Sequence, residues 1–302
     1  MENNQKEILF SVPGKMVNLK EFLKVSFSPT GNPDEVGTDI QCGCKLTIPD
    51  KYKVNHPLCI ISHGSGGIGS DTQLFVDSLS HRGIASLVVD SFTSRNITTL
   101  DWSDAKQSYM APKDRALETF NSYKFLKDNP YLTRNLNLDK LACVGFSWGA
   151  DTIANLMAWW GEELPKDTFY SLVYGNLWPF ERRFYKGRDH DITLYHGADD
   201  NWTSAEKSKV FAEQTNSEFV EFWGCTHGFC KPGKDGVVEK GQTINYHVDY
   251  PVPTELKAVW GMVATKGKLW HDTDFKTVDA KMDYDQLATE RVIADIVTKL
   301  KG

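Results

Sequence analysis

Short apolar runs alternate with amphipathic stretches along most of this chain. The runs predict buried strands, because they are too short for buried helices and are bounded by glycine, proline or polar residues. They cover residues 58–61, 84–89, 141–144, 170–174, 192–195 and 219–223. Apolar residues at helical spacing predict helices over residues 72–81, 112–127, 150–160 and 284–300. This alternation predicts an α/β fold, with a mostly parallel central sheet and helices on both of its faces.

Three parts of the chain depart from this rhythm. Residues 21–28 and 41–48, separated by a turn-rich stretch, predict two antiparallel, half-exposed strands. Residues 91–110 form a long connection, and residues 230–283 form a longer one that contains several aromatic side chains. Long connections of this kind are often lids or binding loops, and the aromatic residues favour packing onto the body. We expect one domain over residues 1–302, with an insertion at about 230–283.

Composition narrows the partners that we expect. The chain has 302 residues, 40% of them hydrophobic, and a net charge of -6 without basic runs. An acidic surface is unsuited to nucleic acid or to an anionic membrane, so a small or neutral partner is expected. The polar N-terminus does not resemble a secretory signal, and no apolar run approaches a membrane span, so a cytoplasmic protein is the default. Homo-oligomer formation stays open.

Six cysteines in a chain of this length do not indicate a disulfide framework. Cys225 and Cys230 with His227 could be drawn as a metal site, as could the pair Cys42 and Cys44. However, a Cys-x-Cys spacing is unusual for structural zinc. We therefore expect neither a metal nor a cofactor.

The sharpest chemical signal is the pentapeptide at residues 145–149, Gly-Phe-Ser-Trp-Gly. It matches G-x-S-x-G between a predicted buried strand and a predicted helix. A strand that turns at once into a helix strains the central residue and crowds the flanking ones, so glycine is required at 145 and 149. The turn would expose Ser147 at a helix N-terminus, which favours developing negative charge. The pattern therefore predicts a nucleophilic serine.

A serine hydroxyl needs a base, and the base needs a carboxylate that fixes its tautomer. His227 follows the predicted strand 219–223, and Asp199 and Asp200 follow the predicted strand 192–195. The ends of parallel strands meet at one edge of a sheet, so these side chains can converge on Ser147. The chain order serine, aspartate, histidine is that of α/β-hydrolases. Spacing within this sequence leaves both aspartates open as the acid.

Other residues complete the predicted site. We expect an oxyanion hole from the backbone N–H groups of Trp148, which follows the nucleophile, and of Ser65 in the glycine-rich loop 63–67. The side chains predicted to line the pocket are those of Phe92, Arg95, Trp102, Trp148 and Trp202. Packing in the core or in a loop is the competing interpretation for each of them. Arg95 would either bind a substrate carboxylate or brace its loop through Asp90.

The same glycine-rich loop also matches the motif G-x-G-x-x-G over residues 64–69, and Asp90 lies at the end of the next predicted strand. This is the outline of a dinucleotide-binding site, which makes an oxidoreductase an alternative from another reaction class. Asp71 would repel a pyrophosphate there, and two predicted strands precede the loop. This alternative also leaves Ser147 and His227 without a role, so we do not favour it.

Taken together, these motifs resemble the dienelactone hydrolase family of the α/β-hydrolases. The resemblance rests on residues 63–67, on Val-Asp-Ser-Phe at 89–92 with Arg95, on the serine pentapeptide, on residues 197–203 and on His-Gly-Phe at 227–229. It implies an α/β-hydrolase fold and a Ser147–His227–Asp200 triad. The choice of Asp200 follows from the family's spacing of three residues after Gly197. The namesake enzymes use a cysteine nucleophile, so dienelactone itself is not the expected substrate.

The hypothesis is therefore a serine hydrolase that cleaves an ester or lactone of a small molecule through an acyl-enzyme. A peptidase or amidase of the same fold is the nearest alternative. A non-catalytic ligand-binding protein on a hydrolase scaffold is the alternative outside enzymes.

Overall fold

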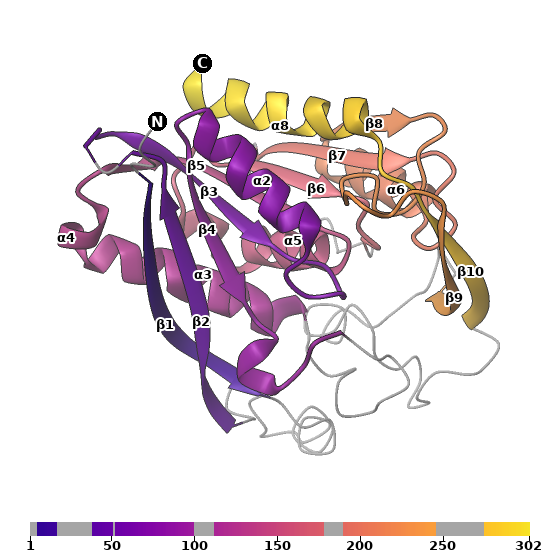
Figure 1. Ribbon diagram of the computed structural model, residues 1–302, viewed down its shortest axis with the longest axis horizontal. Helices are drawn as coiled ribbons and strands as arrows, with labels where there is room; N and C mark the ends of the chain where they lie inside the picture. The colour runs from indigo at the N-terminus through magenta and orange to yellow at the C-terminus, as the bar shows by residue number, and fades with distance from the viewer. Residues whose placement is uncertain (1–4, 17–37, 51, 100–111, 178–189, 246–274) are drawn as a thin grey trace.

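The structure is a computed structural model that describes residues 5–16, 38–50, 52–99, 112–177, 190–245 and 275–302. Its centre is an eight-stranded sheet with the order β1-β2-β4-β3-β5-β6-β7-β8 (Figure 1). The pairs β1–β2 and β2–β4 are antiparallel, and every other neighbouring pair is parallel. The predicted mostly parallel sheet is confirmed.

Six strands of this sheet, β3 to β8, overlap the apolar runs of the sequence, and the two antiparallel strands β1 and β2 precede them. The eight strands are β1 (Lys6–Met16), β2 (Thr38–Ile48), β3 (His56–Ser62), β4 (Ala85–Asp90), β5 (Leu136–Phe146), β6 (Phe169–Val173), β7 (Asp191–Gly197) and β8 (Glu218–Phe222). The central strand β3 is buried at every position. Such burial explains why its sequence is continuously apolar around Leu58 and Ile61 rather than alternating.

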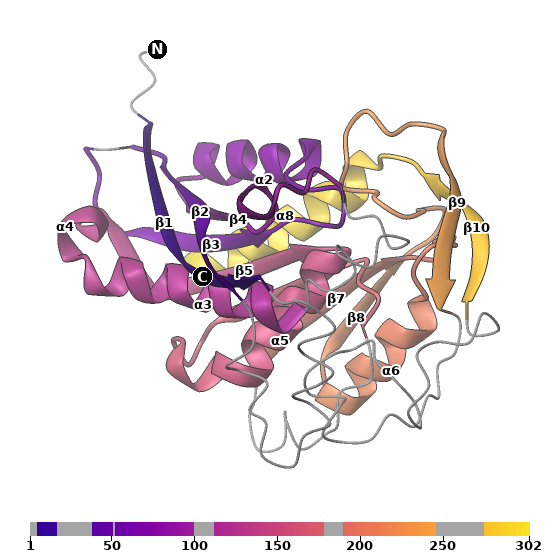
Figure 2. The same ribbon diagram turned by 90° about the horizontal axis from the view of Figure 1, so that it is seen from below.

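Helices cover both faces of the sheet, as the alternation predicts. They are α2 (Ser70–His81), α3 (Pro112–Asp128), α4 (Pro130–Thr133), α5 (Trp148–Trp160), α6 (Ala205–Thr215) and α8 (Gln286–Lys301), with single 3₁₀ turns η2 (Thr93–Arg95) and η3 (Gly161–Glu163). Helices α2 and α8 lie on one face of the sheet, and α3, α5 and α6 lie on the other (Figure 2).

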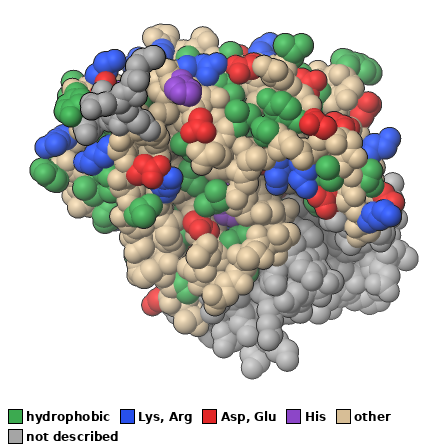
Figure 3. Space-filling model, in the orientation of Figure 1, with side chains coloured by type: hydrophobic (Ala, Val, Ile, Leu, Met, Phe, Trp, Pro, Cys, Tyr) green, Lys and Arg blue, Asp and Glu red, His purple; other side chains and the backbone are tan. Residues whose placement is uncertain are grey.

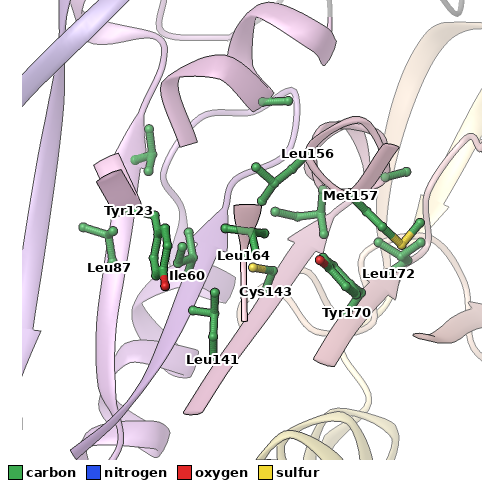
Figure 4. Packing of buried hydrophobic residues seen from close by; sticks show 14 of the residues in the cluster. Ile60, Leu87, Tyr123, Leu141, Cys143, Leu156, Met157, Leu164, Tyr170 and Leu172 are labelled. Atoms are coloured by element: carbon green, nitrogen blue, oxygen red, sulfur yellow. The ribbon is translucent and has the colours of Figure 1, made fainter. Parts of the chain in front are cut away.

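Each face has its own hydrophobic core. The larger cluster lies between the sheet and the helices α3, α5 and α6, and Figure 4 shows part of it, with Tyr123 from α3 and Leu156 from α5 packed over Leu141 and Cys143 of β5. The second cluster lies under α2 and α8 and includes Phe75. Apolar side chains on both faces of the central strands explain why the sheet needs helices on both sides.

Two elements of the sheet region were not predicted. Strand β1 contains Pro13 and Gly14, which usually argue against a strand, but β1 is an edge strand where proline is tolerated. Helix α6 carries a mixed polar pattern that gives no strong helical signal. The strand predicted over residues 21–28 lies outside the described residues.

The insertion contains regular structure that the sequence did not predict. Strands β9 (Val237–Asn245) and β10 (Phe275–Met282) pair antiparallel in a separate two-stranded sheet. The end of β10 forms a bridge to the main body, between Met282 and His227. The insertion therefore contacts the loop that carries the predicted base.

The charge distribution on the surface and the composition of the helices can be compared with the expected partners. Acidic and basic side chains are interspersed over the described part of one face, without a patch of one sign (Figure 3). None of the helices in the described part of the chain is both long enough and apolar enough to cross a membrane.

Candidate active site

Three loops at the carboxyl edge of the parallel strands bring the predicted residues together. Ser147 directly follows β5, Asp200 lies three residues after the end of β7, and His227 lies five residues after the end of β8. Strands β5 and β7 flank β6, and β8 is next to β7. Because all four strands are parallel, their last residues share one edge of the sheet.

The turn at Ser147 has the strained backbone that the pentapeptide predicts. Ser147 has φ 51° and ψ -119°, a conformation that side-chain-bearing residues rarely adopt. A Cβ on Gly145 would lie 2.1 Å from the carbonyl oxygen of Gly149, and a Cβ on Gly149 would lie 2.1 Å from that of Ser62. Both contacts are impossible, so the predicted requirement for two glycines is confirmed. The turn is held by a hydrogen bond from the Ser147 N–H to the carbonyl of Val173, 2.9 Å.

The three predicted side chains form a continuous hydrogen-bonded chain. The Nε2 of His227 lies 3.2 Å from Ser147 Oγ, and its Nδ1 lies 2.8 Å from Asp200 Oδ2. An ionised carboxylate can only accept, so His227 Nδ1 carries the ring proton. Nε2 is then left to accept the hydroxyl proton of Ser147. His227 is 2% exposed, so this geometry is screened from bulk water.

The carboxylate of Asp200 is surrounded by donors. Its Oδ1 accepts from the backbone N–H groups of Trp202 (2.8 Å) and Thr203 (2.9 Å). Its Oδ2 accepts from His227, from the Thr203 hydroxyl at 2.8 Å and from Nε2 of His196 at 3.3 Å. Asp199, the competing candidate, is exposed. The structure therefore places Asp200, and not Asp199, against His227.

These donors decide the ionisation of Asp200. Its side chain is fully buried, and burial alone would raise the pKa of Asp200. The positive charge of His227 and hydrogen bonds from His196 and His227 act in the opposite direction and outweigh it. The net result is a pKa of Asp200 well below its ordinary value, so the group stays ionised.

Three residues of the site were not assigned a role from the sequence. Thr203 Oγ1 lies 2.8 Å from Asp200 Oδ2 and 3.2 Å from His227 Nδ1, and Tyr174 places its ring edge-on to the imidazole of His227, with centroids 5.0 Å apart. The third is His196. Thr203 belongs to the stretch on which the resemblance rests and His196 directly precedes it, but nothing in the sequence shows that both side chains point at one carboxylate oxygen.

The glycine-rich loop passes close to the nucleophile. A Cβ on Gly64 would lie 3.4 Å from Cβ of Ser147, and the N–H of Gly67 bonds to the carbonyl of Gly64 at 3.2 Å. Ser65 lies at the corner of this turn and is half-buried. Trp148 is the first residue of α5, where backbone N–H groups have no partner within the helix. These positions are compatible with the predicted pair of oxyanion donors, which stays a prediction.

The predicted pocket residues differ in their surroundings. Trp202 is half-buried, and its ring lies against His227 with centroids 4.7 Å apart. Phe92 is 2% exposed and packs edge-on against His63 beneath the glycine-rich loop. Trp148 is 5% exposed. Trp102 lies outside the described residues. Of the described aromatic residues, Trp202 therefore has the best position to contact a substrate.

Arg95 is a bracing residue in this structure. It forms an ion pair with Glu118 of α3, with side chains 4% and 0% exposed, and donates to the carbonyls of Ser91 and Lys15. Asp90, the bracing partner expected from the sequence, instead accepts from Phe92 and Thr93 within its own turn. Of the two interpretations, the structure favours bracing, with a different partner.

The loop at residues 64–69 is unlike a dinucleotide site in its surroundings. It follows β3, an inner strand of the sheet, and Gly64 faces the nucleophile. The carboxylate of Asp90 already accepts three hydrogen bonds from its own turn. Asp71 in the first turn of α2 is buried, and burial raises its pKa. The Asp90 carboxylate is therefore engaged in its own turn and not turned towards a ribose.

A second buried carboxylate lies in the helix that begins directly after Ser147. Asp151, in the first turn of α5, is 2% exposed, and burial raises its pKa to about 7. The Asn176 amide and the charges of Lys207 and Arg115 partly oppose this rise. Within the described part of the chain, Asp151 Oδ2 has no hydrogen-bond partner.

The cysteines do not form a centre with the base. All six are free thiols in buried positions, and Cys225 and Cys230 are 4% and 0% exposed. Among the described residues, no group of three or more histidine, cysteine or acidic side chains is placed to hold a metal ion.

The insertion is attached to both loops of the site. The Asn201 side chain donates to the carbonyl of Asp279 (2.9 Å) and accepts from the N–H of Lys281 (3.0 Å). The N–H of Asp283 donates to Thr226 Oγ1 at 2.8 Å. Asn201 follows the acid and Thr226 precedes the base, so the end of β10 bonds to the neighbours of both.

A mostly parallel eight-stranded sheet, helices on both faces and a strained serine turn after β5 define the α/β-hydrolase fold. Solved structures with this fold are similar over most of their length. One is a dienelactone hydrolase-like promiscuous phosphotriesterase from metagenomic libraries, with a TM-score of 0.58 and 13% identity over 97% of both chains. Another is a thermostable esterase from Pseudomonas putida, with a TM-score of 0.52 and 13% identity over 75% of this chain and 76% of that one. No protein-family model and no curated protein sequence matches the chain.

Proposed function

We propose that this protein is a serine hydrolase that cleaves an ester or lactone of a small molecule. The observation that carries the proposal is the chain of contacts from Ser147 Oγ through His227 to Asp200, at 3.2 and 2.8 Å. A serine on a strained turn, a base with its free nitrogen towards that serine, and a buried ionised acid are the parts that acyl transfer requires.

The first step is attack on the substrate carbonyl. Ser147 Oγ forms a bond to the carbonyl carbon while His227 Nε2 takes the hydroxyl proton. The imidazolium that results is stabilised by Asp200, whose negative charge is held by its five donors. The N–H groups of Trp148 and Ser65 are proposed to hold the oxyanion, since both belong to segments beside the nucleophile.

The second step releases the alcohol and restores the serine. His227 gives its proton to the leaving oxygen, and the acyl group stays on Ser147 as an ester. A water then attacks this ester with His227 again as base, and the acid product leaves. In a lactone the leaving oxygen is part of the same molecule, so the product is a hydroxy acid.

The structural neighbours support the reaction class without naming a substrate. One neighbour is named a promiscuous phosphotriesterase and another an esterase, so both names describe the cleavage of an ester. Trp202 beside His227 offers an apolar wall for a small acyl or alcohol group.

Labelling with a fluorophosphonate probe tests the proposal directly. The probe phosphonylates an activated serine with loss of fluoride, so wild type is expected to label and Ser147→Ala is not. Equal labelling of both would overturn the proposal. Absence of labelling in wild type would favour a ligand-binding protein on the same scaffold.

A substrate panel then separates the enzymatic alternatives. p-Nitrophenyl esters, lactones and aminoacyl amides are compared at equal concentration, with Ser147→Ala as the blank. Turnover of esters or lactones above amides is expected. A preference for the aminoacyl amides would instead assign a peptidase or amidase.

A further inference from the structure

His196 has no part in the three-residue mechanism, yet it contacts the proposed acid. It is the penultimate residue of β7 and is 0% exposed. Its Nε2 lies 3.3 Å from Asp200 Oδ2 and 3.2 Å from the carbonyl oxygen of Thr203. Its Nδ1 lies 3.0 Å from Oγ of Ser208, a buried residue of α6.

These contacts fix the tautomer of the ring. Nε2 faces a carboxylate and a carbonyl, which can only accept, so Nε2 carries the proton. It also lies 3.4 Å from Thr203 Oγ1, whose own proton is donated to Asp200. In the neutral ring Nδ1 is then an acceptor, and the Ser208 hydroxyl is its donor. The result is a directed chain in which Ser208 donates to His196 and the N–H of His196 is shared between the Thr203 carbonyl and Asp200.

Two imidazole N–H groups thus approach one oxygen of Asp200, and one of them is shared with the Thr203 carbonyl. His227 Nδ1 approaches Asp200 Oδ2 at 2.8 Å and His196 Nε2 approaches it at 3.3 Å. A second donor on this oxygen fixes its direction, because the carboxylate cannot rotate without losing both bonds. It also draws electron density from the bond to His227, which weakens the pull of Asp200 on that ring.

We infer that His196 is a positioning residue of the proposed triad, which holds Asp200 Oδ2 in line with His227 and shares the negative charge of that oxygen. The inference rests on the proposed function for its effect on rate. The contacts among His196, Asp200 and His227 do not rest on it, and NMR of the His227 ring follows them without an assay of activity.

The titratable groups around Asp200 decide in which direction the pH profile moves when His196 is replaced. Asp200 is faced by His196 and His227, and Tyr174 packs on His227 from the loop after β6. Of these, only the two histidines donate to the carboxylate. Removing the His196 donor leaves more negative charge for His227, so the imidazolium of His227 is stabilised and its pKa rises. The acid limb of kcat/KM then moves to higher pH.

The experiment compares variants at His196 with a buried histidine elsewhere. His196→Phe keeps an aromatic ring and removes the donor, whereas His196→Gln places an amide N–H near the position of Nε2. His56→Phe is the matched control, since His56 is 5% exposed, bonds to two carbonyls and lies at the start of β3. Two readouts are used: the pH profile of kcat/KM on a p-nitrophenyl ester, and the titration of His227 followed by NMR.

His196→Phe is expected to raise both midpoints by about half a pH unit and to lower kcat more than it changes KM. His196→Gln is expected to stay within about 0.2 units of wild type, and His56→Phe likewise. Unchanged midpoints in a folded His196→Phe protein would overturn the inference, as would equal shifts in all three variants.

Two further measurements keep the test decisive. If His196→Phe does not fold, Ser208→Ala takes its place, because loss of the Ser208 donor frees the ring and weakens its bond to Asp200. Ser208→Ala is expected to move the midpoints in the same direction by a smaller amount, and no movement would overturn the inference. If wild type shows no hydrolysis that depends on Ser147, the proposed function fails, and the NMR titration alone decides the role of His196.

Discussion

Two buried carboxylates lie near Ser147, one in the loop after β7 and one in the first turn of α5, and they differ in ionisation. Asp200 accepts from five donors, and its pKa is held well below the ordinary value. Asp151 is equally inaccessible, but one of its oxygens has no hydrogen-bond partner within the described residues. Burial therefore dominates there and raises the pKa of Asp151 to about 7.

The difference shows that depth alone does not decide whether an acid is charged. Desolvation acts on both groups in the same direction, and the charges and hydrogen bonds of their neighbours outweigh it at Asp200 but not at Asp151. The loop 200–203 supplies donors because its backbone N–H groups fold back onto the side chain of its first residue. Asp151 lies in the first turn of α5, where the backbone N–H groups of Asn176 and of Asp151 itself donate to its carboxylate but do not outweigh burial.

The largest expected effect comes from removing the charge of Asp200. Asp200→Asn is expected to lower kcat/KM about 10⁴-fold, because an amide no longer fixes the tautomer of His227 or stabilises its charge. The exposed neighbour provides the control, and Asp199→Asn is expected to leave kcat/KM unchanged. Ester hydrolysis measured at pH 8 checks both. If Asp199→Asn lowered kcat/KM as much as Asp200→Asn, the assignment of Asp200 as the acid would be wrong.

The next effect concerns stability and the charge of Asp151. The folded-state pKa of about 7 lies above the ordinary value of 3.8, so the folded protein binds more protons than the unfolded chain between these values. Stability then falls as pH rises from about 4 to 7, by up to about 4 kcal/mol. Asp151→Asn imitates the protonated acid and is expected to remove this slope.

Urea unfolding at pH 4, 5.5 and 7 measures the slope for wild type and Asp151→Asn. The two proteins are expected to converge at pH 4 and to diverge towards pH 7, with the variant more stable. Parallel curves would show that Asp151 is as well solvated as an ordinary surface acid.

A smaller effect is expected from a change at Thr203. This change removes one donor of Asp200 and leaves the burial of Asp200 as it is. Thr203→Val keeps the shape of the side chain and removes the hydroxyl that donates to Asp200 at 2.8 Å. The free energy of unfolding is expected to fall by about 2 kcal/mol, the usual worth of a hydrogen bond to a charged group. Thr203→Ser retains the hydroxyl and is expected to stay close to wild type. Equal losses in both variants would assign the effect to packing.

The smallest effect is expected where the insertion meets the acid loop. Asn201→Ala removes two hydrogen bonds to β10 but none to Asp200. We expect a loss of about 1 kcal/mol in stability, since the contacts are exposed, and at most a several-fold change in kcat/KM. Urea unfolding and ester hydrolysis measure the two. A loss of activity as large as that of Asp200→Asn would show that β10 orders the acid loop.

Much of the architecture followed from local pattern. The buried runs around Leu58 and Leu141 and the serine pentapeptide are continuous in sequence, so their strands and the strained turn could be predicted, although β5 begins at Leu136, five residues before the predicted run. Strand β1 was not predicted because Pro13 and Gly14 argue against a strand. They are tolerated here because β1 lies at the edge of the sheet. Strands β9 and β10 were not predicted because each is completed by a partner about 40 residues away, which no local pattern reveals.

The sequence by itself determined the nucleophile turn, the order of the strands that carry Ser147, the acid and His227, and the need for glycine at 145 and 149. These features depend on sterics between neighbouring residues. Only the tertiary structure decided which of Asp199 and Asp200 faces His227, that Arg95 pairs with Glu118, and that His196 and Thr203 donate to the acid. Each of those contacts joins side chains from separate elements, and their directions are fixed only when the sheet brings the strand ends together.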